Sequence, residues 1–449
     1  MKHRKTAARR TSSTARTLDW LRQYESRNVT YLAPDGTWPI VWARARGSHV
    51  WDVKGRRYLD LTAAFGVAAA GHANPAVVGA ARRQMRQLLH AMGDVHPHPQ
   101  KAQLARELSR LTFERWTADA AGTGRLTGKT IFCNSGFEAV EAALKTARLA
   151  TGRPGVIAFT GGYHGLGYGT LNVTQREHFR HPFRDQLREF AAFVPFPRDE
   201  PGVAAAENEI LAWIGRGGIG AILVEPLQAR GGIRVPSPAL LPMLRRLCDQ
   251  HKLLLILDEI YTGFGRTGRW FACEHTDVVP DLICLGKALT GGFPLSACVG
   301  RADVMDAWPP STGEAIHTST YLGHPVGCAM ALAQIAEIRR LKLCERSAQL
   351  GKLFVDALHL VAMMWNEGSV KLEARGLGLM MGLELTDAEG RPATEATLQL
   401  VTRLLRRGFV FIPEGEAANV LSWTPPLLIA ERSLMASLKA VVAELRNLR

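Results

Sequence analysis

An acid and a lysine each end an apolar stretch of this chain, and together their types fit one kind of organic chemistry. Asp258 follows the apolar run 253–257, and Lys287 closes DLICLGK beside several glycines. A carboxylate can keep a ring nitrogen protonated, and a desolvated lysine has a lowered pKa and a nucleophilic amine. Taken alone, Asp258 could be a helix N-cap and Lys287 an exposed turn residue. As a pair they predict an organic cofactor with a ring nitrogen and a carbonyl carbon, such as pyridoxal 5'-phosphate (PLP).

Two glycine-containing turns could complete such a site. Ser135, Gly136 and Phe137 lie between the strand-like KTIFCN and the helical pattern EAVEAALKTARLA. A turn into a helix N-terminus presents free N–H groups to an anion such as phosphate. The segment GGYHG places Tyr163 and His164 between glycines, and the tyrosine ring could stack on a flat cofactor. The alternative for each segment is an ordinary surface turn.

A third glycine segment, GFGRTG over residues 263–268, matches the dinucleotide-binding pattern G-x-G-x-x-G. That pattern requires the glycines to open a helix, and here no helical period follows. The acid expected some 20 residues further on is absent from the sequence as well. A nucleotide-dependent oxidoreductase is therefore a poor second hypothesis.

Alternating strands and helices are expected to position these residues. From about residue 75 to 340, short apolar stretches alternate with helical patterns such as ALLPMLRRLCDQHK, which predicts an α/β domain with a mostly parallel sheet. Ligands bind at the carboxyl ends of the strands in such sheets, which is where Asp258 and Lys287 stand. The expected strands are KTIFCNS, GVIAFT, AILVEP, LLLILDE, DLICLGK and LSACVG.

The two ends of the chain predict a second, smaller α+β layer. Residues 47–61 have the pattern of an antiparallel hairpin, which we expect to pack with the C-terminal part. After residue 340 come a long helical pattern, the strand-like GLGLMMGLEL, a helix around 393–407 and short strands near 409 and 420. The predicted units are a basic disordered tail (1–18), an N-terminal segment packing with the small domain (19–74), a large cofactor-binding domain (75–340) and a C-terminal small domain (341–449).

Composition and charge restrict the function classes. The chain has 449 residues, of which 47% are apolar and 21% charged, and it contains no apolar run long enough to span a membrane. Six basic residues of the tail contribute to the net charge of +14, and the remaining +8 does not predict nucleic-acid binding. We expect the Arg-rich tail to be disordered. The alternatives are an organelle-targeting peptide, or a basic binding protein that uses the tail on nucleic acid or acidic partners.

The seven cysteines are scattered through the chain without a CxxC pair. In a chain of this size they predict free thiols in a reducing cytoplasm, and neither a disulfide framework nor a metal site is expected.

Seven segments, in order, resemble the class III (ornithine/4-aminobutyrate type) aminotransferases, which are PLP enzymes of fold type I (aspartate aminotransferase-like). The resemblance runs from about Gly47 to Pro426, nearly the whole chain outside the tail. One such match would be weak, but seven in the same order are highly specific. The segments are NSGFEAVEAALKTAR, GYHG, EPLQARGG, DEIYTGFGRTG, PDLICLGKALTGGFPLSA, HTSTYLGHP and ARGLGLMMGLEL.

The resemblance implies a role for each matching residue. Lys287 corresponds to the lysine that forms a Schiff base with the cofactor, Asp258 to the partner of the ring nitrogen, and Glu225 to an acid near the cofactor. A neighbouring subunit is expected to share the site, which implies a homodimer. The other residues expected at the cofactor are Ser135, Gly136 and Phe137 at the phosphate, Tyr163 and Ile260 on the two ring faces, His164 beside them, and Thr320, which would reach the phosphate of the neighbouring subunit.

The substrate side of the site departs from the family pattern. Arg375 matches the arginine that binds a substrate carboxylate, and Phe65 matches an aromatic of the substrate pocket. Arg230 stands where the ornithine and 4-aminobutyrate enzymes have a glutamate that masks the carboxylate-binding arginine. Tyr261 stands where some members have a glutamine. We expect Arg375, Phe65 and Arg230 to contact the substrate, and the resemblance leaves the identity of the amino donor open.

The implied function is ping-pong transamination from an amine or amino acid, ω-amino acids included, to a 2-oxo acid such as 2-oxoglutarate or pyruvate. Some members of the family are instead amino-acid racemases, epimerases or aminomutases with the same lysine, acid and phosphate motifs. Transfer of the amine to an added 2-oxo acid would distinguish the first function from the second, in which a chiral amino acid simply loses its optical activity.

Overall fold

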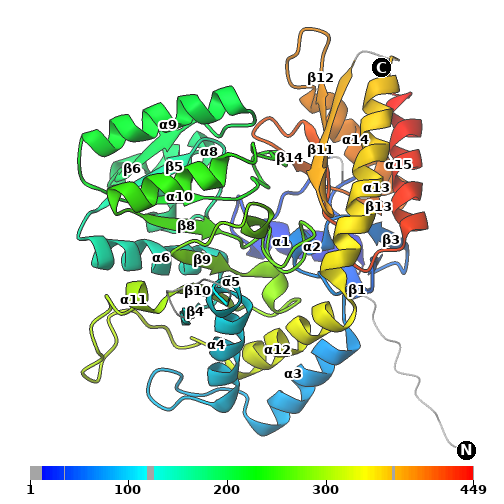
Figure 1. Cartoon of the computed structure of the whole chain (residues 1–449). Coiled ribbons are helices and arrows are strands. Elements are labelled where there is room, and N and C mark those ends of the chain that lie inside the picture. Colours follow the sequence, from blue (N-terminus) through cyan, green and yellow to red (C-terminus); the bar gives the residue numbers. More distant parts are fainter. Residues whose placement is uncertain (1–12, 35, 119–125, 367–369, 448–449) are drawn as a thin grey trace, which may run out of the picture.

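Three β-sheets and the helices around them make up the computed structural model, which describes residues 13–34, 36–118, 126–366 and 370–447. A central seven-stranded sheet occupies one region of the molecule, on the left of Figure 1, and two four-stranded sheets occupy the other. An α/β part beside a smaller α+β part is the arrangement that the sequence predicts.

The central sheet contains every strand predicted for it and one more. Its strands are β4 (Gly128–Cys133), β5 (Gly155–Phe159), β6 (Ala191–Val194), β7 (Ile219–Val224), β8 (Leu254–Asp258), β9 (Leu282–Leu285) and β10 (Ser296–Arg301). Their order is β4-β10-β9-β8-β7-β5-β6, and β10 runs in the direction opposite to the other six strands. Strand β6 is not predicted from the sequence, because its residues AAFV are too few to show a clear alternation of apolar and polar side chains.

Alternate side chains of this sheet belong to two separate cores. In β5, Ile157 belongs to one core and Val156 to the other. Because both faces are buried, the strands have nearly continuous apolar sequences. One face is covered by α4 (Pro99–Leu111), α9 (Glu200–Gly215) and α10 (Leu240–His251), and the other by α6 (Gly136–Thr151), as Figure 1 shows. The sheet is thereby a rigid frame for the loops at its ends.

The predicted N-terminal hairpin is present and joins the C-terminal part, as expected. Its strands pair antiparallel with His49 opposite Leu59, and its second strand also pairs in parallel with a C-terminal strand, which places Phe409 beside Leu59. This sheet has the order β1-β2-β3-β13, formed by β1 (Trp42–Arg46), β2 (His49–Asp52), β3 (Arg57–Asp60) and β13 (Phe409–Val410).

The segment GLGLMMGLEL, predicted as one strand, contributes to two. It spans the end of β11 (Lys371–Leu377) and most of β12 (Met380–Thr386), which pair antiparallel. The turn passes through Gly378 at φ +57°, where a Cβ would lie 2.4 Å from the backbone carbon of Thr267. Only glycine allows both the turn and this contact, and the apolar run on both sides concealed it in the sequence. The same sheet contains β14 (Pro413–Glu414) and β15 (Val420–Trp423).

The remaining longer helices pack around these sheets. In Figure 1, α3 and α12 lie side by side, and α13 lies beside α15. Their bounds are α3 (Pro75–Gln87), α12 (Pro325–Arg340), α13 (Leu343–Met364), α14 (Thr394–Arg406) and α15 (Glu431–Leu445). The short helical segments are α2 (Ala63–Gly66), α5 (Phe113–Trp116), α7 (Tyr168–Leu171), α8 (Glu177–Arg180) and α11 (Ala302–Met305).

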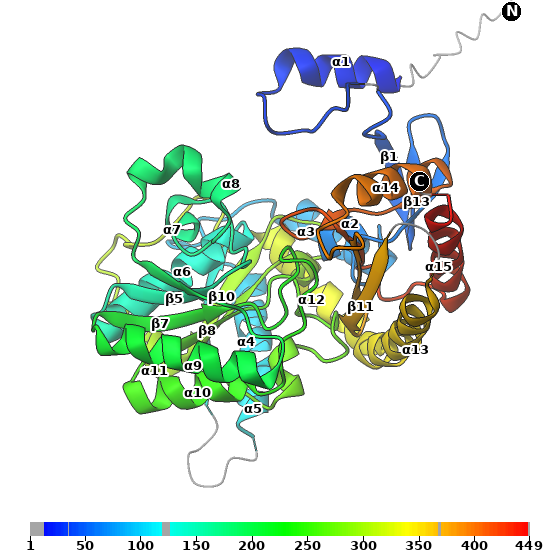
Figure 2. The same cartoon turned by 90° about the horizontal axis from the view of Figure 1, so that it is seen from above.

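Helix α1 (Thr14–Tyr24) begins inside the segment that the sequence predicts as a disordered tail. Ser13 caps it, because the Ser13 hydroxyl accepts a hydrogen bond from the backbone N–H of Arg16 at 3.2 Å. In Figure 2 the helix stands apart from the two main regions. The expectation of disorder therefore fails for residues 14–18, and residues 1–12 lie outside the described part of the chain.

All seven cysteines are free and buried. Burial raises the pKa of Cys328 and of Cys344 to about 12, which makes their thiols poor nucleophiles. Within the described residues, no helix is long and apolar enough to cross a membrane.

Candidate active site

The carboxyl ends of five parallel strands of the central sheet bring the predicted residues to one cavity of about 420 Å³. Asp258 is the last residue of β8, Glu225 follows β7 directly, and Lys287 follows β9 after one glycine. This is the edge at which open α/β sheets bind ligands. The predicted residues that line the cavity are Gly136, Phe137, Tyr163, His164, Glu225, Arg230, Asp258, Ile260 and Lys287.

Two hydrogen bonds fix the direction of the Asp258 carboxylate, which is only 5% exposed. Its Oδ2 lies 2.8 Å from Nδ1 of His164, and its Oδ1 accepts from the backbone N–H of Ile260 at 3.1 Å. The backbone of His164 is itself held, because its N–H donates to the hydroxyl of Thr174 at 2.9 Å. His164 therefore positions the acid.

Lys287 is half-buried at the cavity wall, and its backbone is strained. Its φ of +37° lies in the left-handed region, which costs free energy for a residue with a Cβ and is typical of functional sites. Burial lowers the pKa of its amine, although Asp258 and Glu225 oppose this shift. The Nζ lies 4.5 Å from the centre of the Tyr261 ring. A larger share of neutral amine makes Lys287 a nucleophile and a base.

Glu225 joins two loops of the cavity wall. Its Oε1 accepts from the backbone N–H of Tyr163 at 3.0 Å, and its Oε2 from that of Ala229 at 3.2 Å. Burial raises the pKa of Glu225 to about 7. The ring of Tyr163 packs edge-on against Phe179, with 5.6 Å between the ring centres. This acid therefore holds the Tyr163 loop against the loop that follows β7.

The first turn of α6 forms an anion site in the same cavity. The first N–H groups of a helix have no partner within the helix, and the buried Ser135 hydroxyl has no hydrogen-bond partner among the described residues. A Cβ on Gly165 would lie 2.2 Å from the Cβ of Phe137, and one on Gly136 would lie 3.1 Å from Cδ1 of Ile260. Because these glycines have no Cβ, the segments that line the cavity pack closely. The N-terminus of α6 can bind a phosphate group.

Comparison with known proteins decides the family, because the model of the family described as aminotransferase class-III matches residues 31–445. The chain belongs to the class-III aminotransferases. It is similar to the acetylornithine aminotransferase of Methanopyrus kandleri, with 37% identity over 91% of this chain and 95% of the relative. It is also similar to the 5-aminovalerate aminotransferase of Pseudomonas aeruginosa, with 36% identity over 90% and 93%. A PLP-bound amine transaminase from an uncultivated Pseudomonas species has the same fold, with a TM-score of 0.84 and 28% identity over 95% of this chain and 99% of that chain.

The residues of this aminotransferase fit PLP, the cofactor of its family. The buried acid, the half-buried lysine and the unsatisfied hydroxyl at a helix N-terminus offer partners for a ring nitrogen, an aldehyde and a phosphate, respectively. Asp258, Lys287 and the turn 135–137 would hold these three groups. When bound, PLP supplies an aldehyde carbon that takes up amines and a ring that accepts electrons.

The chain itself contributes proton transfer and orientation to the reaction. The Nζ of Lys287 can take a proton from a donor carbon and return it, and a base of this kind contributes ~10²–10⁴-fold to a rate. The ring of Tyr261 confines this amine, and the hydroxyl of Tyr261 lies 3.2 Å from that of Thr424. The rigid contacts of Asp258 and Glu225 keep both carboxylates in place while the proton moves.

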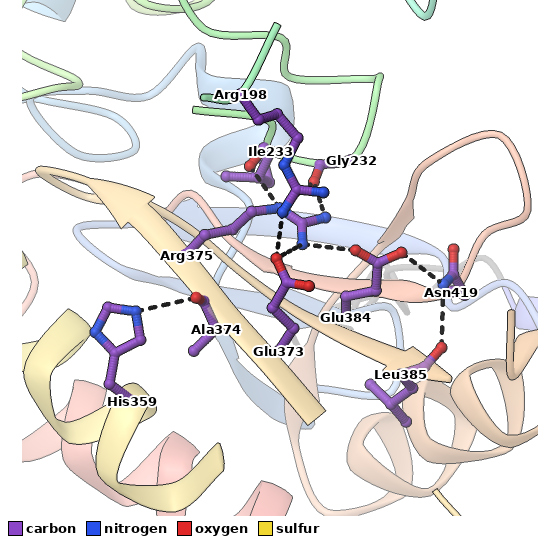
Figure 3. Close-up of polar contacts among 10 residues, drawn as sticks. All are labelled: Arg198, Gly232, Ile233, His359, Glu373, Ala374, Arg375, Glu384, Leu385 and Asn419. Carbon is purple, nitrogen blue, oxygen red and sulfur yellow. Dashed lines mark hydrogen bonds and ion pairs between the residues drawn. The ribbon is translucent and has the colours of Figure 1, made fainter. Parts of the chain in front are cut away.

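Arg375, predicted to bind a substrate carboxylate, instead binds the loop that carries Arg230. It is 8% exposed, and Figure 3 shows its guanidinium among protein partners. Its Nη2 donates to the carbonyl of Gly232 at 2.7 Å, its Nε to that of Ile233 at 2.9 Å, and its Nη1 to Glu384 at 2.6 Å. Nε and both terminal nitrogens thus each donate to a protein oxygen, and Arg375 is not among the residues that line the cavity of Lys287. In this structure Arg375 holds the loop that carries Arg230, and its contact with a substrate carboxylate stays a prediction.

Arg375→Lys is expected to destabilise this loop, because one ammonium group cannot bind two carbonyls and a carboxylate in the same geometry. We expect the Tm of the PLP-loaded protein to fall by about 5 °C, with a higher KM for carboxylate substrates. Differential scanning calorimetry and steady-state kinetics measure both. An unchanged Tm together with a large loss of carboxylate affinity would indicate that Arg375 binds the substrate carboxylate directly.

Two further predicted residues lie away from the cavity in this chain. Phe65 is 52% exposed and belongs to a left-handed turn, with φ +46°, +49° and +62° at residues 63–65. Thr320 is exposed too, and its neighbour Ser319 accepts a hydrogen bond from the Asn134 side chain at 3.1 Å. The expectation that Phe65 lines the substrate pocket is therefore not met within one subunit. For Thr320, a role in a neighbouring subunit stays a prediction.

Sequence reasoning missed two charged residues near the cavity, Arg176 and Glu414. Both are buried, at 7% and 2% exposure respectively. Arg176 donates to the backbone carbonyl of Arg230, and Glu414 faces the Arg230 side chain. Nothing in the patterns around residues 176 and 414 marks them, since each comes from a loop or short strand far from Arg230 in sequence.

Proposed function

We propose that this aminotransferase takes its amino group from an ω-amino acid and passes it to a 2-oxo acid. The observation that carries this proposal is Arg230, which lines the same cavity as Lys287 and is 32% exposed on its side chain. A guanidinium there can bind a carboxylate remote from the reacting amine through two hydrogen bonds. The Pseudomonas aeruginosa relative named above supports the proposal, since 5-aminovalerate has its amine and its carboxylate at opposite ends.

The test compares 5-aminovalerate with pentylamine, which has the same length but no carboxylate, each with 2-oxoglutarate or pyruvate as acceptor. We expect kcat/KM to be about 10–100-fold higher for 5-aminovalerate, because a hydrogen bond to a charged group contributes ~1.5–3 kcal/mol. Equal values for the two donors would contradict the proposed substrate class. Loss of optical activity from a chiral amino acid, with no amine transferred to either acceptor, would indicate a racemase instead.

We also propose that the protein is a homodimer in which Thr320 reaches the site of the neighbouring subunit. Exposed apolar side chains gather on the segments 85–95 and 316–321, which contact each other through Thr318 and Asp94 at 2.6 Å. Large exposed apolar surfaces of this kind are typical of protein interfaces. These exposed side chains are Met85, Leu88, Leu89, Met92, Val95, Ile316 and Tyr321.

For the dimer, sedimentation equilibrium of the PLP-loaded protein is expected to give about twice the chain mass of 49.2 kDa. Met92→Glu on the apolar surface should weaken association and reduce turnover in parallel, whereas Met363→Glu, at an exposed site on α13, should change neither. Full activity in a preparation that sediments as a monomer would contradict the shared site.

For the location we propose a reducing compartment such as the cytoplasm. The seven free thiols support it, because oxidising compartments favour disulfides. Fractionation of the cells that produce the protein tests this, and recovery from an oxidising compartment would contradict it.

A further inference from the structure

Arg230 faces a buried carboxylate beside the cavity. Its Nη1 lies 3.5 Å from Oε2 of Glu414, and the Glu414 side chain is 2% exposed, against 32% for Arg230. The guanidinium also lies 5.8 Å from the centre of the Tyr163 ring. Arg230 is thus placed between a protein carboxylate on one side and the substrate cavity on the other.

The ion pair between Arg230 and Glu414 is loose. Its 3.5 Å separation exceeds the ~2.7–2.9 Å of a charge-assisted hydrogen bond. Among the described residues, Oε2 of Glu414 has no hydrogen-bond partner, although burying an unsatisfied carboxylate is costly. The contact that Arg230 gives up when it turns to another carboxylate is therefore weak, and the nearby Arg176 still offsets the charge of Glu414.

Backbone contacts hold both residues in place, so that only their side chains can exchange partners. The N–H of Gly415 donates to the carbonyl of Arg230 at 3.2 Å, and Glu414 pairs with Val420 in the sheet. Arg176 also donates to the carbonyl of Arg230, and its own Nε has no partner among the described residues. Two guanidinium groups thus lie near Glu414, and Arg176 interacts with Glu225 and Glu416 as well.

We propose that Glu414 is a specificity-determining residue that competes with the substrate carboxylate for Arg230. It neutralises the guanidinium when the bound molecule has no carboxylate at that position and releases it when the molecule has one. For the amino donors, this inference rests on the proposed function. In a ping-pong reaction the donor and the 2-oxo acid use the same cavity in turn, and a movable counter-ion lets Arg230 serve both.

The binding test uses glutarate, a dicarboxylate without an amine, and isothermal titration of the PLP-loaded protein. Glu414→Gln is expected to tighten glutarate binding about 10-fold, because it removes the competing charge. Arg230→Gln should weaken binding at least 10-fold. In the Arg230→Gln background, Glu414→Gln should have no further effect, since residues that act on one another are not additive.

The kinetic test separates this role from general support of the fold. In Glu414→Gln we expect a lower KM for 5-aminovalerate, a higher KM for pentylamine, and a kcat within about 2-fold of the wild type for each donor. Glu414→Asp, which keeps the charge, should restore part of the discrimination, and it serves as the test variant if Glu414→Gln fails to fold. Glu416→Gln is the matched control, since Glu416 is exposed and lies two residues away.

Equal effects of Glu414→Gln and Glu416→Gln on glutarate affinity, or additive effects of Glu414→Gln and Arg230→Gln, would overturn the inference. The glutarate titration needs no turnover. If no donor transfers its amine, the proposed function is wrong. The titration still measures whether Glu414 and glutarate compete for Arg230.

Discussion

Lys287→Ala is expected to reduce transamination by more than ~10³-fold, because it removes both the nucleophile of the cavity and the base that moves the proton. The variant should also lose the visible absorbance of lysine-bound PLP and release the cofactor during gel filtration. Among the described residues, Lys287 is the only lysine that lines the cavity, so that no other lysine is placed to substitute for it. Absorbance spectra before and after gel filtration, together with turnover, measure the three effects.

Lys352→Ala is the matched control for Lys287→Ala. Lys352 is 80% exposed on α13 and pairs with Asp356 at 3.1 Å. A surface pair of this kind contributes little to stability, so we expect the spectrum and turnover of the control to equal those of the wild type. If Lys287→Ala keeps the absorbance band through gel filtration, another residue binds the cofactor and the assignment of Lys287 is wrong.

Asp258→Asn is expected to lower kcat by ~10²–10³-fold, the size of effect typical when one preorganised electrostatic partner is lost. An amide has nearly the same shape but no charge, so the contacts with His164 and Ile260 can persist while the cofactor ring loses its acidic partner. PLP should still bind, because Lys287 and the phosphate turn are unchanged. Single-turnover kinetics and the absorbance of bound PLP separate these two outcomes.

Asp281→Asn is the matched control, because Asp281 is also a buried acid of the central sheet but lies away from the cavity. It pairs with Arg245 and Arg301 at 2.8 and 2.9 Å. Removing this charge should lower Tm, since it leaves two arginines short of a partner, but it should not change kcat. Equal losses of kcat in both variants would indicate that Asp258 acts only through the stability of the sheet.

The cofactor part of the site could be predicted from sequence because its residues follow strands. Asp258, Glu225 and Lys287 stand immediately after β8, β7 and β9, and the carboxyl ends of parallel strands meet at one edge. The glycine run 263–268 opens no α-helix, as its sequence predicts, and Gly268 packs against Ala348 of α13. The order of the strands in the sheet places these three residues at one edge. The strands themselves can be predicted from the pattern of apolar residues in the sequence.

The substrate part could not be predicted in the same way, because its side chains depend on contacts between distant loops. Arg375 is an arginine of suitable type, but carbonyls of residues 232 and 233 and the Glu384 carboxylate, brought close by the fold, occupy its donors. Glu414 lies on a two-residue strand whose position depends on pairing with β15. Neither the contacts of Arg375 nor the pairing of β14 with β15 produces a periodic pattern in the sequence.

The seven buried thiols described above have a practical consequence for measuring how this molecule opens. A thiol that is both buried and poorly ionised reacts with an alkylating reagent only after the surrounding structure separates. Cys284 of β9 is paired with Cys298 on the adjacent strand β10 of the central sheet, whereas Cys344 lies in the first turn of α13. Mass spectrometry of timed alkylation would therefore give opening rates at both places in one experiment, with no label added to the chain.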